Sequence, residues 1–172
     1  RPAPTRGAAK DTARPVSPQV AIPPTNDVNN SGCFAVTGAT GSLGKVVVAE
    51  LLSRNLPVLA FGQSEGRLQA LHTLHQSPLL ETVVCDIGDW VTMRDAFNGA
   101  QSVNRIIHAA ALKRVGESYA NPTEYIRVNL VGTQAVLIAA QKAKLRPSSF
   151  PRRVLFVSSD KAVAAHNPYG AT

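Results

Sequence analysis

From Cys33 to the end of the chain, short apolar runs alternate with longer segments in which apolar residues recur every three or four positions. The short runs predict buried strands, and the longer segments predict amphipathic helices. Strands are expected at residues 33–36, 56–61, 79–85, 105–108 and 153–157. Because strands that alternate with helices imply right-handed crossovers, we predict an α/β fold with a doubly wound parallel sheet, covered on both faces.

The periodic segments predict four helices whose ends are marked by capping or breaking residues. They are expected over 45–52 with a stop at Asn55, around 68–75, from the N-cap Asp89 to Gly99, and from Pro122 to Ala139 with a break at Pro147. In the second helix, Leu68, Leu71, Leu74 and His75 are expected to share one face.

Residues 1–31 differ in composition from the rest of the chain. They contain six prolines among Ala, Arg, Thr and Ser, with hardly any large apolar side chain. Such a segment cannot bury enough surface to offset the entropy of ordering, so we predict a disordered tail or linker, with a targeting sequence as the alternative. Residues 32–172 are predicted to form one domain.

Composition limits the classes of function. The net charge of +7 is spread along 172 residues, and aromatic residues make up only 5%, which disfavours a nucleic-acid partner and suits a polyanionic small molecule such as a nucleotide sugar. Cys33 and Cys85 lie in apolar runs without metal-ligand spacing, so we expect small buried hydrophobes, a reducing compartment and no metal. No apolar run approaches the length of a membrane span, and we predict a cytoplasmic location.

Three glycines spaced three apart, Gly38, Gly41 and Gly44, follow the first predicted strand and open the first helix. Glycine lets the backbone turn sharply and lets phosphate oxygens approach, while free N–H groups at the helix N-terminus face the anion. The spacing is one residue longer than the commoner G-x-G-x-x-G, but its strand–turn–helix context predicts a pyrophosphate cradle. We therefore predict that residues 32–172 form a dinucleotide-binding domain of the Rossmann type.

Ligands of open parallel sheets bind at the carboxyl ends of the strands. Gln63 and Ser64 follow the second strand, where a side chain usually hydrogen-bonds the adenosine ribose. No Asp or Glu stands there to bind two ribose hydroxyls and no Arg to bind a 2′-phosphate, so the choice between NAD and NADP stays open. Asp86 follows the third strand as an adenine acceptor or a turn residue. Three small residues follow the fourth strand, Ala109, Ala110 and Ala111, and they let a flat cofactor lie against the sheet or simply allow close helix packing. Lys113 comes next and either contacts a phosphate or is solvated.

The richest chemical cluster follows the fifth strand: Ser158, Ser159, Asp160 and Lys161, with Tyr169 nearby. A desolvated or cation-flanked lysine can have its pKa lowered into the range of a general base, and an adjacent cation can assist a tyrosine. The alternative is an exposed Asp–Lys pair with a packed tyrosine. The glycine cradle upstream favours an active site. His108 is expected to be a hydrogen-bonded strand-end residue and not a base.

Four stretches resemble extended short-chain dehydrogenase/reductases of the polysaccharide-biosynthesis branch, which contains inverting UDP-N-acetylglucosamine 4,6-dehydratases. They are Thr37-Gly38-Ala39-Thr40-Gly41-Ser42-Leu43-Gly44, the His108–Val115 segment, the Asn121–Thr133 segment, and Ser158-Ser159-Asp160-Lys161 with Tyr169-Gly170-Ala171-Thr172. The resemblance covers residues 33–172, and the Asp–Lys pair followed by Tyr169 is its specific part.

The resemblance implies a mechanism that recycles tightly bound NADP. Tyr169 would help remove the C4 hydroxyl proton, Lys161 would abstract the C5 proton, Asp160 would assist loss of the C6 hydroxyl as water, and Ser159 would bond near O4. It also implies cofactor and substrate contacts: Thr40, Gly41, Ser42 and Leu43 at the phosphates, Asp86 with Ile87 at the adenine, and Ala109 with Lys113 in the cleft.

Departures from the family pattern affect these expectations. Ser159 replaces the usual Thr, Ala164-Ala165 replace an Asn-Pro, and the usual Arg after the second strand is missing. The family's second lysine would fall at position 173, so we expect a chain truncated before its C-terminal substrate-binding part and inactive alone. The full-length protein is expected to form a homo-oligomer and to bind a UDP-sugar. Alternatives are an epimerase or reductase of the same superfamily, or a non-catalytic dinucleotide-binding module.

Overall fold

A computed structural model describes residues 32–100, 103–144 and 153–172 of the chain. The predicted tail over 1–31 and the predicted break at Pro147 lie outside these residues. The predicted strands, the four predicted helices and the candidate site residues all fall within the described residues.

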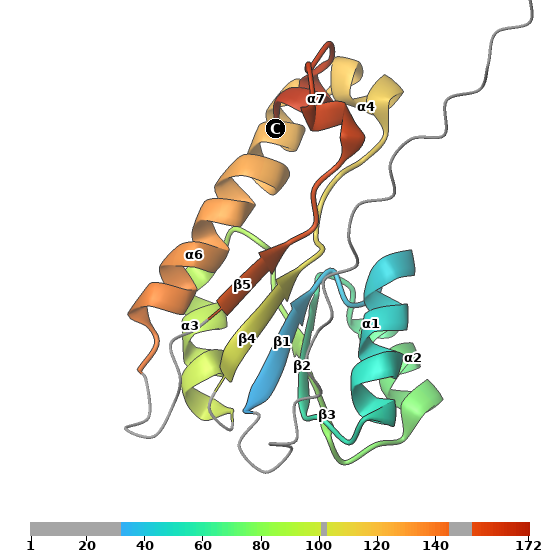
Figure 1. Cartoon of the computed structure of the whole chain (residues 1–172), viewed down its shortest axis with the longest axis vertical. Helices are drawn as coiled ribbons and strands as arrows, with labels where there is room; N and C mark the ends of the chain where they lie inside the picture. The colour runs from blue at the N-terminus through green and yellow to red at the C-terminus, as the bar shows by residue number, and fades with distance from the viewer. Residues whose placement is uncertain (1–31, 101–102, 145–152) are drawn as a thin grey trace, which may run out of the picture.

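The core of the fold is a five-stranded, entirely parallel sheet (Figure 1). Its strands are β1 (Cys33–Thr37), β2 (Val58–Gly62), β3 (Leu80–Val84), β4 (Val103–His108) and β5 (Arg153–Phe156), in the spatial order β3-β2-β1-β4-β5. The order reverses between β1 and β4, which is the topological switch point of a doubly wound fold. The predicted Rossmann-type α/β class is therefore confirmed.

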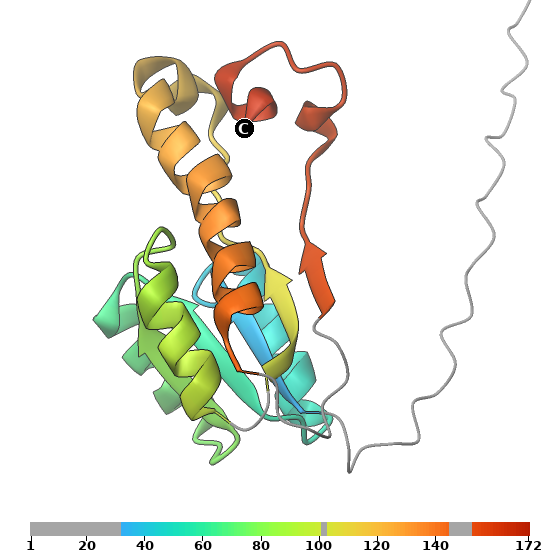
Figure 2. The ribbon, with the colours of Figure 1, turned by 90° about the vertical axis from the view of Figure 1, so that its left-hand side faces the viewer.

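Helices cover the two faces of the sheet from opposite sides (Figures 1 and 2). One face carries α1 (Ser42–Ser53) and α2 (Glu65–His75); the other carries α3 (Trp90–Gly99) and α6 (Gly132–Lys142). Successive strand residues point to opposite faces, so Ala35 joins the core under α3 and α6 while Val36 joins the core under α1 and α2. At β5 the coverage is incomplete, since Leu155 and Phe156 remain exposed.

The helix predicted from Pro122 forms, but one turn of it is a π-helix. α5 (Pro122–Tyr125) continues into the π-helical segment η2 (Ile126–Val131) and then into α6. A π turn contains an extra residue and therefore shifts the phase of the helix. In this π-helical segment Val131 is exposed, whereas Asn129 is buried.

One helical prediction needs correction, and one helix was not predicted. In α2, Leu68 and Leu71 are buried and His75 is half-buried, but Leu74 is 71% exposed and so does not share their buried face. The sequence pattern also missed the short α4 (Val115–Ala120). Asn55 is confirmed as a helix stop, with the left-handed φ of 56°.

Among the described residues, no helix has the length and apolar character needed to cross a membrane.

Candidate active site

The glycine turn between β1 and α1 packs directly against the loop that follows β4. Gly38 has φ +68°, and a Cβ on it would lie 2.7 Å from the Ala109 carbonyl oxygen and from the Ala110 nitrogen. A Cβ on Gly44 would collide with the Gly38 carbonyl. Gly41 caps α1 without a side-chain hydrogen bond, so the first N–H groups of this helix remain available to an anion. The turn therefore fits the pyrophosphate of a dinucleotide.

Two cavities flank the glycine turn and share Gly38, Gly41 and Ala109–Ala111 as a common wall. We call them the β2–β3 cavity, of about 300 Å³, and the β4–β5 cavity, of about 730 Å³. Predicted site residues in the β2–β3 cavity also include Thr40, Gln63, Ser64, Asp86 and Ile87. Those in the β4–β5 cavity also include Ser42, Leu43, Gly44, Lys113, Ser159, Asp160 and Tyr169.

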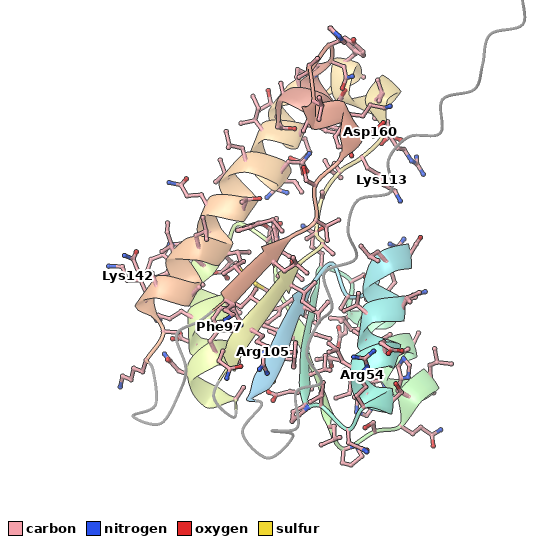
Figure 3. The ribbon with its side chains drawn as sticks, in the orientation of Figure 1. Arg54, Phe97, Arg105, Lys113, Lys142 and Asp160 are labelled. Carbon is pink, nitrogen blue, oxygen red and sulfur yellow. The ribbon has the colours of Figure 1, made fainter. Side chains whose placement is uncertain are left out.

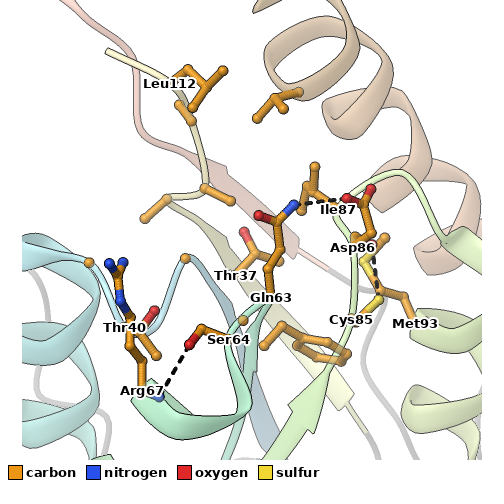
Figure 4. Close-up of a pocket in the computed structure, with 18 of the residues that line it drawn as sticks. Thr37, Thr40, Gln63, Ser64, Arg67, Cys85, Asp86, Ile87, Met93 and Leu112 are labelled. Carbon is orange, nitrogen blue, oxygen red and sulfur yellow. Dashed lines mark hydrogen bonds between the residues drawn. The ribbon is translucent and has the colours of Figure 1, made fainter. Parts of the chain in front are cut away.

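In the β2–β3 cavity, the side chains predicted to read the ribose have protein partners (Figure 4). Gln63 Nε2 donates to Asp86 Oδ2 at 2.8 Å. Ser64 is the N-cap of α2, and its hydroxyl accepts the N–H of Arg67 at 3.4 Å. Both residues line the cavity, but each also holds a neighbouring group in place.

Asp86 is both a turn residue and a cavity residue, so the two interpretations of it are compatible. Its Oδ1 accepts the N–H of Gly88 at 2.8 Å and Nη1 of Arg127 at 2.9 Å. Partial burial acts to raise the pKa of this carboxyl, but the Gly88 N–H, Arg127 and Gln63 together hold the pKa below its usual value. Asp86 is therefore an ionised acceptor at neutral pH.

Arg67 is a cavity residue that the sequence analysis missed. It lies in the first turn of α2 and lines the β2–β3 cavity with Thr40 and Ser64 (Figure 4). An arginine was expected directly after the second strand, but side chains of a first helical turn tilt back toward the helix N-terminus and hence toward the strand end. That geometric rule was the signal that could have identified Arg67.

Ser159, Asp160 and Tyr169 line the β4–β5 cavity together with the glycine turn. Lys161 is not among the described residues that line either cavity. Asp160 and Lys161 lie on the 3-10 turn η3 (Asp160–Ala162), where Lys161 Nζ is 2.8 Å from Asp160 Oδ2. Lys113 and Asp160 both lie beyond the carboxyl ends of the strands (Figure 3). Three of the four residues predicted to be catalytic therefore line one cavity, and the fourth, Lys161, contacts one of them, Asp160.

The charge state of the Asp–Lys pair differs from the sequence-based expectation. We expected desolvation or a cation to lower the pKa of Lys161, but the hydrogen bond to Asp160 raises it. The same hydrogen bond, with a further one from Ser159, lowers the pKa of Asp160. Because both side chains are exposed, attraction between opposite charges outweighs desolvation, and the pair is fully ionised.

Tyr169 lies on the short helix α7 (Pro168–Ala171), whose N-cap Asn167 accepts the Gly170 N–H at 2.8 Å. Its ring meets that of buried Tyr125 edge to face, with the centroids 6.3 Å apart. Tyr169 therefore packs and also lines the β4–β5 cavity.

A buried polar network supports the wall between the cavities. His108 Nδ1 bonds to Thr37 Oγ1 at 2.7 Å and His108 Nε2 to Thr133 Oγ1 at 2.9 Å, which confirms the expected hydrogen-bonded histidine. Burial lowers the pKa of His108 to about 4, so the ring is neutral at pH 7. Asn129, in the π turn, bonds both the N–H and the carbonyl of Leu112 at 2.8 and 3.0 Å. The network fixes the loop after β4.

Within the described ranges, no group of three or more His, Cys, Asp or Glu side chains could hold a metal ion. Cys33 and Cys85 are free and buried, as predicted. Burial raises the pKa of the Cys33 thiol to about 12 and that of Cys85 to about 11, so neither is a thiolate at neutral pH.

Comparison with known proteins places these observations in a family. Over 140 residues the chain is 31% identical to UDP-glucose 4-epimerase of Rickettsia rickettsii, an alignment that covers 78% of this chain and 38% of that protein. Over 141 residues it is 36% identical to an uncharacterised membrane protein of Methanocaldococcus jannaschii, covering 80% and 39%. The chain thus spans about two fifths of the length of these relatives.

Among solved structures, UDP-glucose 4-epimerase of Bifidobacterium longum in complex with NAD+ and UDP superposes with a TM-score of 0.68 at 25% identity, covering 81% of this chain and 45% of that one. Residues 34–172, from β1 through Tyr169, match the family described as polysaccharide biosynthesis protein. This match takes in both cavities and more than half of the chain, and we conclude that the protein belongs to the polysaccharide biosynthesis protein family.

Proposed function

We propose that this chain is the dinucleotide-binding part of a nucleotide-sugar 4,6-dehydratase that acts on UDP-N-acetylglucosamine. The observation that carries the proposal is the β4–β5 cavity, where Ser159, Asp160 and Tyr169 share one space with the glycine turn. Family membership and relatives named as UDP-glucose 4-epimerases support a nucleotide-sugar substrate. The full-length protein is proposed to be a cytoplasmic homo-oligomer.

A bound nicotinamide supplies an acceptor for hydride from C4 of the sugar and a donor of hydride to C6. The phenol of Tyr169 helps to remove the C4 hydroxyl proton, and Ser159 bonds near O4. Lys161 then takes the C5 proton, which the neighbouring 4-keto group acidifies, while Asp160 gives a proton to the C6 hydroxyl as it leaves as water. One proton leaves C5 and one enters the departing water. Hydride return to C6 then gives an enolate that takes up one proton at C5, and this proton offsets the one lost from the C4 hydroxyl, so the whole sequence balances.

These roles require a proton shift within the Asp160–Lys161 pair. In the structure the proton lies on Lys161, whereas a base at Lys161 and an acid at Asp160 need it on the carboxyl. The 2.8 Å hydrogen bond between Nζ and Oδ2 provides the path. Substrate that covers the cavity removes water from both groups, and desolvation favours the neutral pair over the ionic one. We propose that substrate binding drives this transfer.

We propose NADP as the cofactor because Arg67 reaches the β2–β3 cavity. A hydrogen bond to a charged group contributes about 1.5–3 kcal/mol, so the Arg67→Gln variant should lower affinity for NADP about 10- to 100-fold and leave affinity for NAD nearly unchanged. Titration calorimetry with both cofactors measures this. Arg54→Gln is the control, because Arg54 pairs with Glu50 at the other end of α1. Equal losses for both cofactors would remove the support for NADP.

The decisive experiment incubates the full-length protein with NADP and UDP-N-acetylglucosamine and follows products by NMR and mass spectrometry. The expected product is a 4-keto-6-deoxy sugar nucleotide that has lost one water. A Lys161→Ala variant should lose this product and still bind cofactor. If Lys161→Ala turns over like wild type, the base role is wrong.

A nucleotide-sugar epimerase or reductase is the second candidate. One observation favours it: Lys161, which only the dehydratase needs as a base, lies outside the described lining of both cavities, while Ser159 and Tyr169 lie inside. Formation of a 4-epimer without any keto product would establish this candidate. Cofactor binding by wild type with no turnover of any sugar nucleotide would instead favour a non-catalytic module.

A further inference from the structure

A chain of four polar side chains runs along the β2–β3 cavity from Gln63 to Glu124. Gln63 bonds to Asp86, Asp86 to Arg127, and Arg127 to Glu124 through Nε at 2.8 Å and Nη2 at 2.7 Å. The four come from the end of β2, the end of β3, the π turn and α5. Gln63, Asp86 and Glu124 line the cavity, and Figure 4 shows the Gln63–Asp86 bond within it.

Stability alone does not explain this arrangement. The side chains of Arg127, Asp86 and Glu124 are about two fifths exposed, at 42%, 45% and 39%. Ion pairs of this exposure contribute little to folding, because water competes with the partner charge. The geometry, however, is constrained: Glu124 holds the Arg127 guanidinium on two of its nitrogens, and the third donates to Asp86.

The hydrogen bonds at Asp86 are unequally divided between its two oxygens. Oδ1 accepts two, from the Gly88 N–H and from Arg127, whereas Oδ2 accepts one, from Gln63. A carboxylate has about four acceptor sites, two on each oxygen. Arg127 and Gly88 therefore fill Oδ1 and fix the rotation of the carboxylate, and the remaining acceptor site lies on Oδ2.

We propose that Arg127 is a positioning residue for the cofactor: it orients the Asp86 carboxylate so that Oδ2 accepts the 6-amino group of an adenine in the β2–β3 cavity. This inference rests on the proposed dinucleotide cofactor. Arg127 itself does not touch the base and acts through Asp86. Loss of Arg127 leaves Asp86 free to rotate, so the recognition of the amino group weakens while other contacts to the dinucleotide persist.

The test compares NADP+ with an analogue whose adenine is replaced by unsubstituted purine, which lacks the 6-amino group. Calorimetry on the full-length wild type should show NADP+ bound about tenfold more tightly, the effect of one hydrogen bond to a charged group. In Arg127→Met this ratio should fall to near one, mainly through weaker binding of NADP+. Arg127→Lys, which keeps the charge but loses the fork to Glu124, should give an intermediate ratio and guards against a folding defect in Arg127→Met.

The Arg54→Met variant is the matched control, because Arg54 also pairs with a glutamate on its own helix but lies far from the cavity; its ratio should equal that of wild type. A tenfold ratio retained in Arg127→Met and Arg127→Lys would overturn the inference and leave the proposed function intact. A wild type that binds both dinucleotides equally would do the same. A wild type that binds neither would overturn the proposed cofactor, and with it both proposals.

Discussion

The two cavities on either side of the glycine turn are built differently. The floor of the β2–β3 cavity is core: Phe61, Cys85, Ile87 and Met93 are all at least nine-tenths buried. The β4–β5 cavity is bounded by the exposed Phe156 at the end of the edge strand β5, by the exposed Val157 that follows it, and by the Asp160 side chain, which is 81% exposed. One cavity belongs to the packed layers, and the other lies at the margin of the sheet.

In the proposed function, this difference separates cofactor binding from chemistry. The residues over β1–β3 that are proposed to hold a cofactor are tied to the core, so their substitution is expected to affect stability and affinity together. Residues around β5 contribute little to the core and can change with little loss of folding free energy. The shared wall is made by the glycine turn and the loop after β4, and it borders both cavities. A substitution there is expected to change stability and ligand affinity together.

The largest effect is expected from Tyr169→Phe in the full-length protein. Removal of a general acid–base group lowers turnover by about 10²- to 10⁴-fold. The free energy of unfolding should change by less than about 0.5 kcal/mol, because the ring still packs on Tyr125. Turnover assays and urea unfolding measure the two quantities.

Tyr119→Phe is the control for this prediction, because the Tyr119 hydroxyl donates to the His166 carbonyl at 3.1 Å, also near α7 but outside the described lining of both cavities. It should retain turnover. Equal losses in the two variants would mean that the region acts only through its structure, and the contrast between the cavities would fail.

A smaller effect is expected at the shared wall from the protonation of His108. Its pKa is about 4 in the folded protein and about 6.5 in an unfolded chain. As pH falls below 6.5, the unfolded state gains a proton that the folded state does not, so stability falls until about pH 4 and then levels. The shift corresponds to a loss of about 3 kcal/mol.

Urea unfolding of wild type and of His108→Gln between pH 7 and pH 4 isolates this contribution, because the carboxyl groups of the two proteins are the same. The variant should be less stable at pH 7 and should show a flatter pH dependence across this window. If the two proteins lose stability in parallel, His108 does not carry the effect.

Gly38→Ala tests the shared wall through the backbone. A non-glycine residue with this positive φ is strained by about 1–3 kcal/mol, and its Cβ would press on the loop after β4. We expect lower unfolding stability in urea and weaker cofactor binding by calorimetry. Gly66→Ala is the matched control, since it lies in helix α2 with nothing within 4 Å of the added Cβ, and it should stabilise the protein by up to about 1 kcal/mol. Unchanged cofactor affinity in Gly38→Ala would contradict the proposed cradle.

Much of the lining of the two cavities was predictable because the ends of parallel strands gather at one edge of the sheet. Asp86 and Tyr169 follow different strands and were both expected at this edge, and each lines one of the two cavities. Arg67 was missed because it follows its strand by one helical turn. The position of Lys161 could not be anticipated either, since the direction of its side chain depends on the local pairing with Asp160 on η3.

The sequence alone determined the order of strands and helices, the glycine turn and the class of fold, because hydrophobic period and glycine spacing act over a few residues. Only the tertiary structure decided which side chains restrain one another. The Arg127–Asp86 bond joins residues 41 positions apart, and it depends on a π turn that shifts the helix phase. The glycine turn is visible in the sequence. Its contact with the loop after β4, which separates a cavity lined by the core from a cavity at the edge of the sheet, is visible only in the tertiary structure, because it depends on β1 and β4 lying side by side.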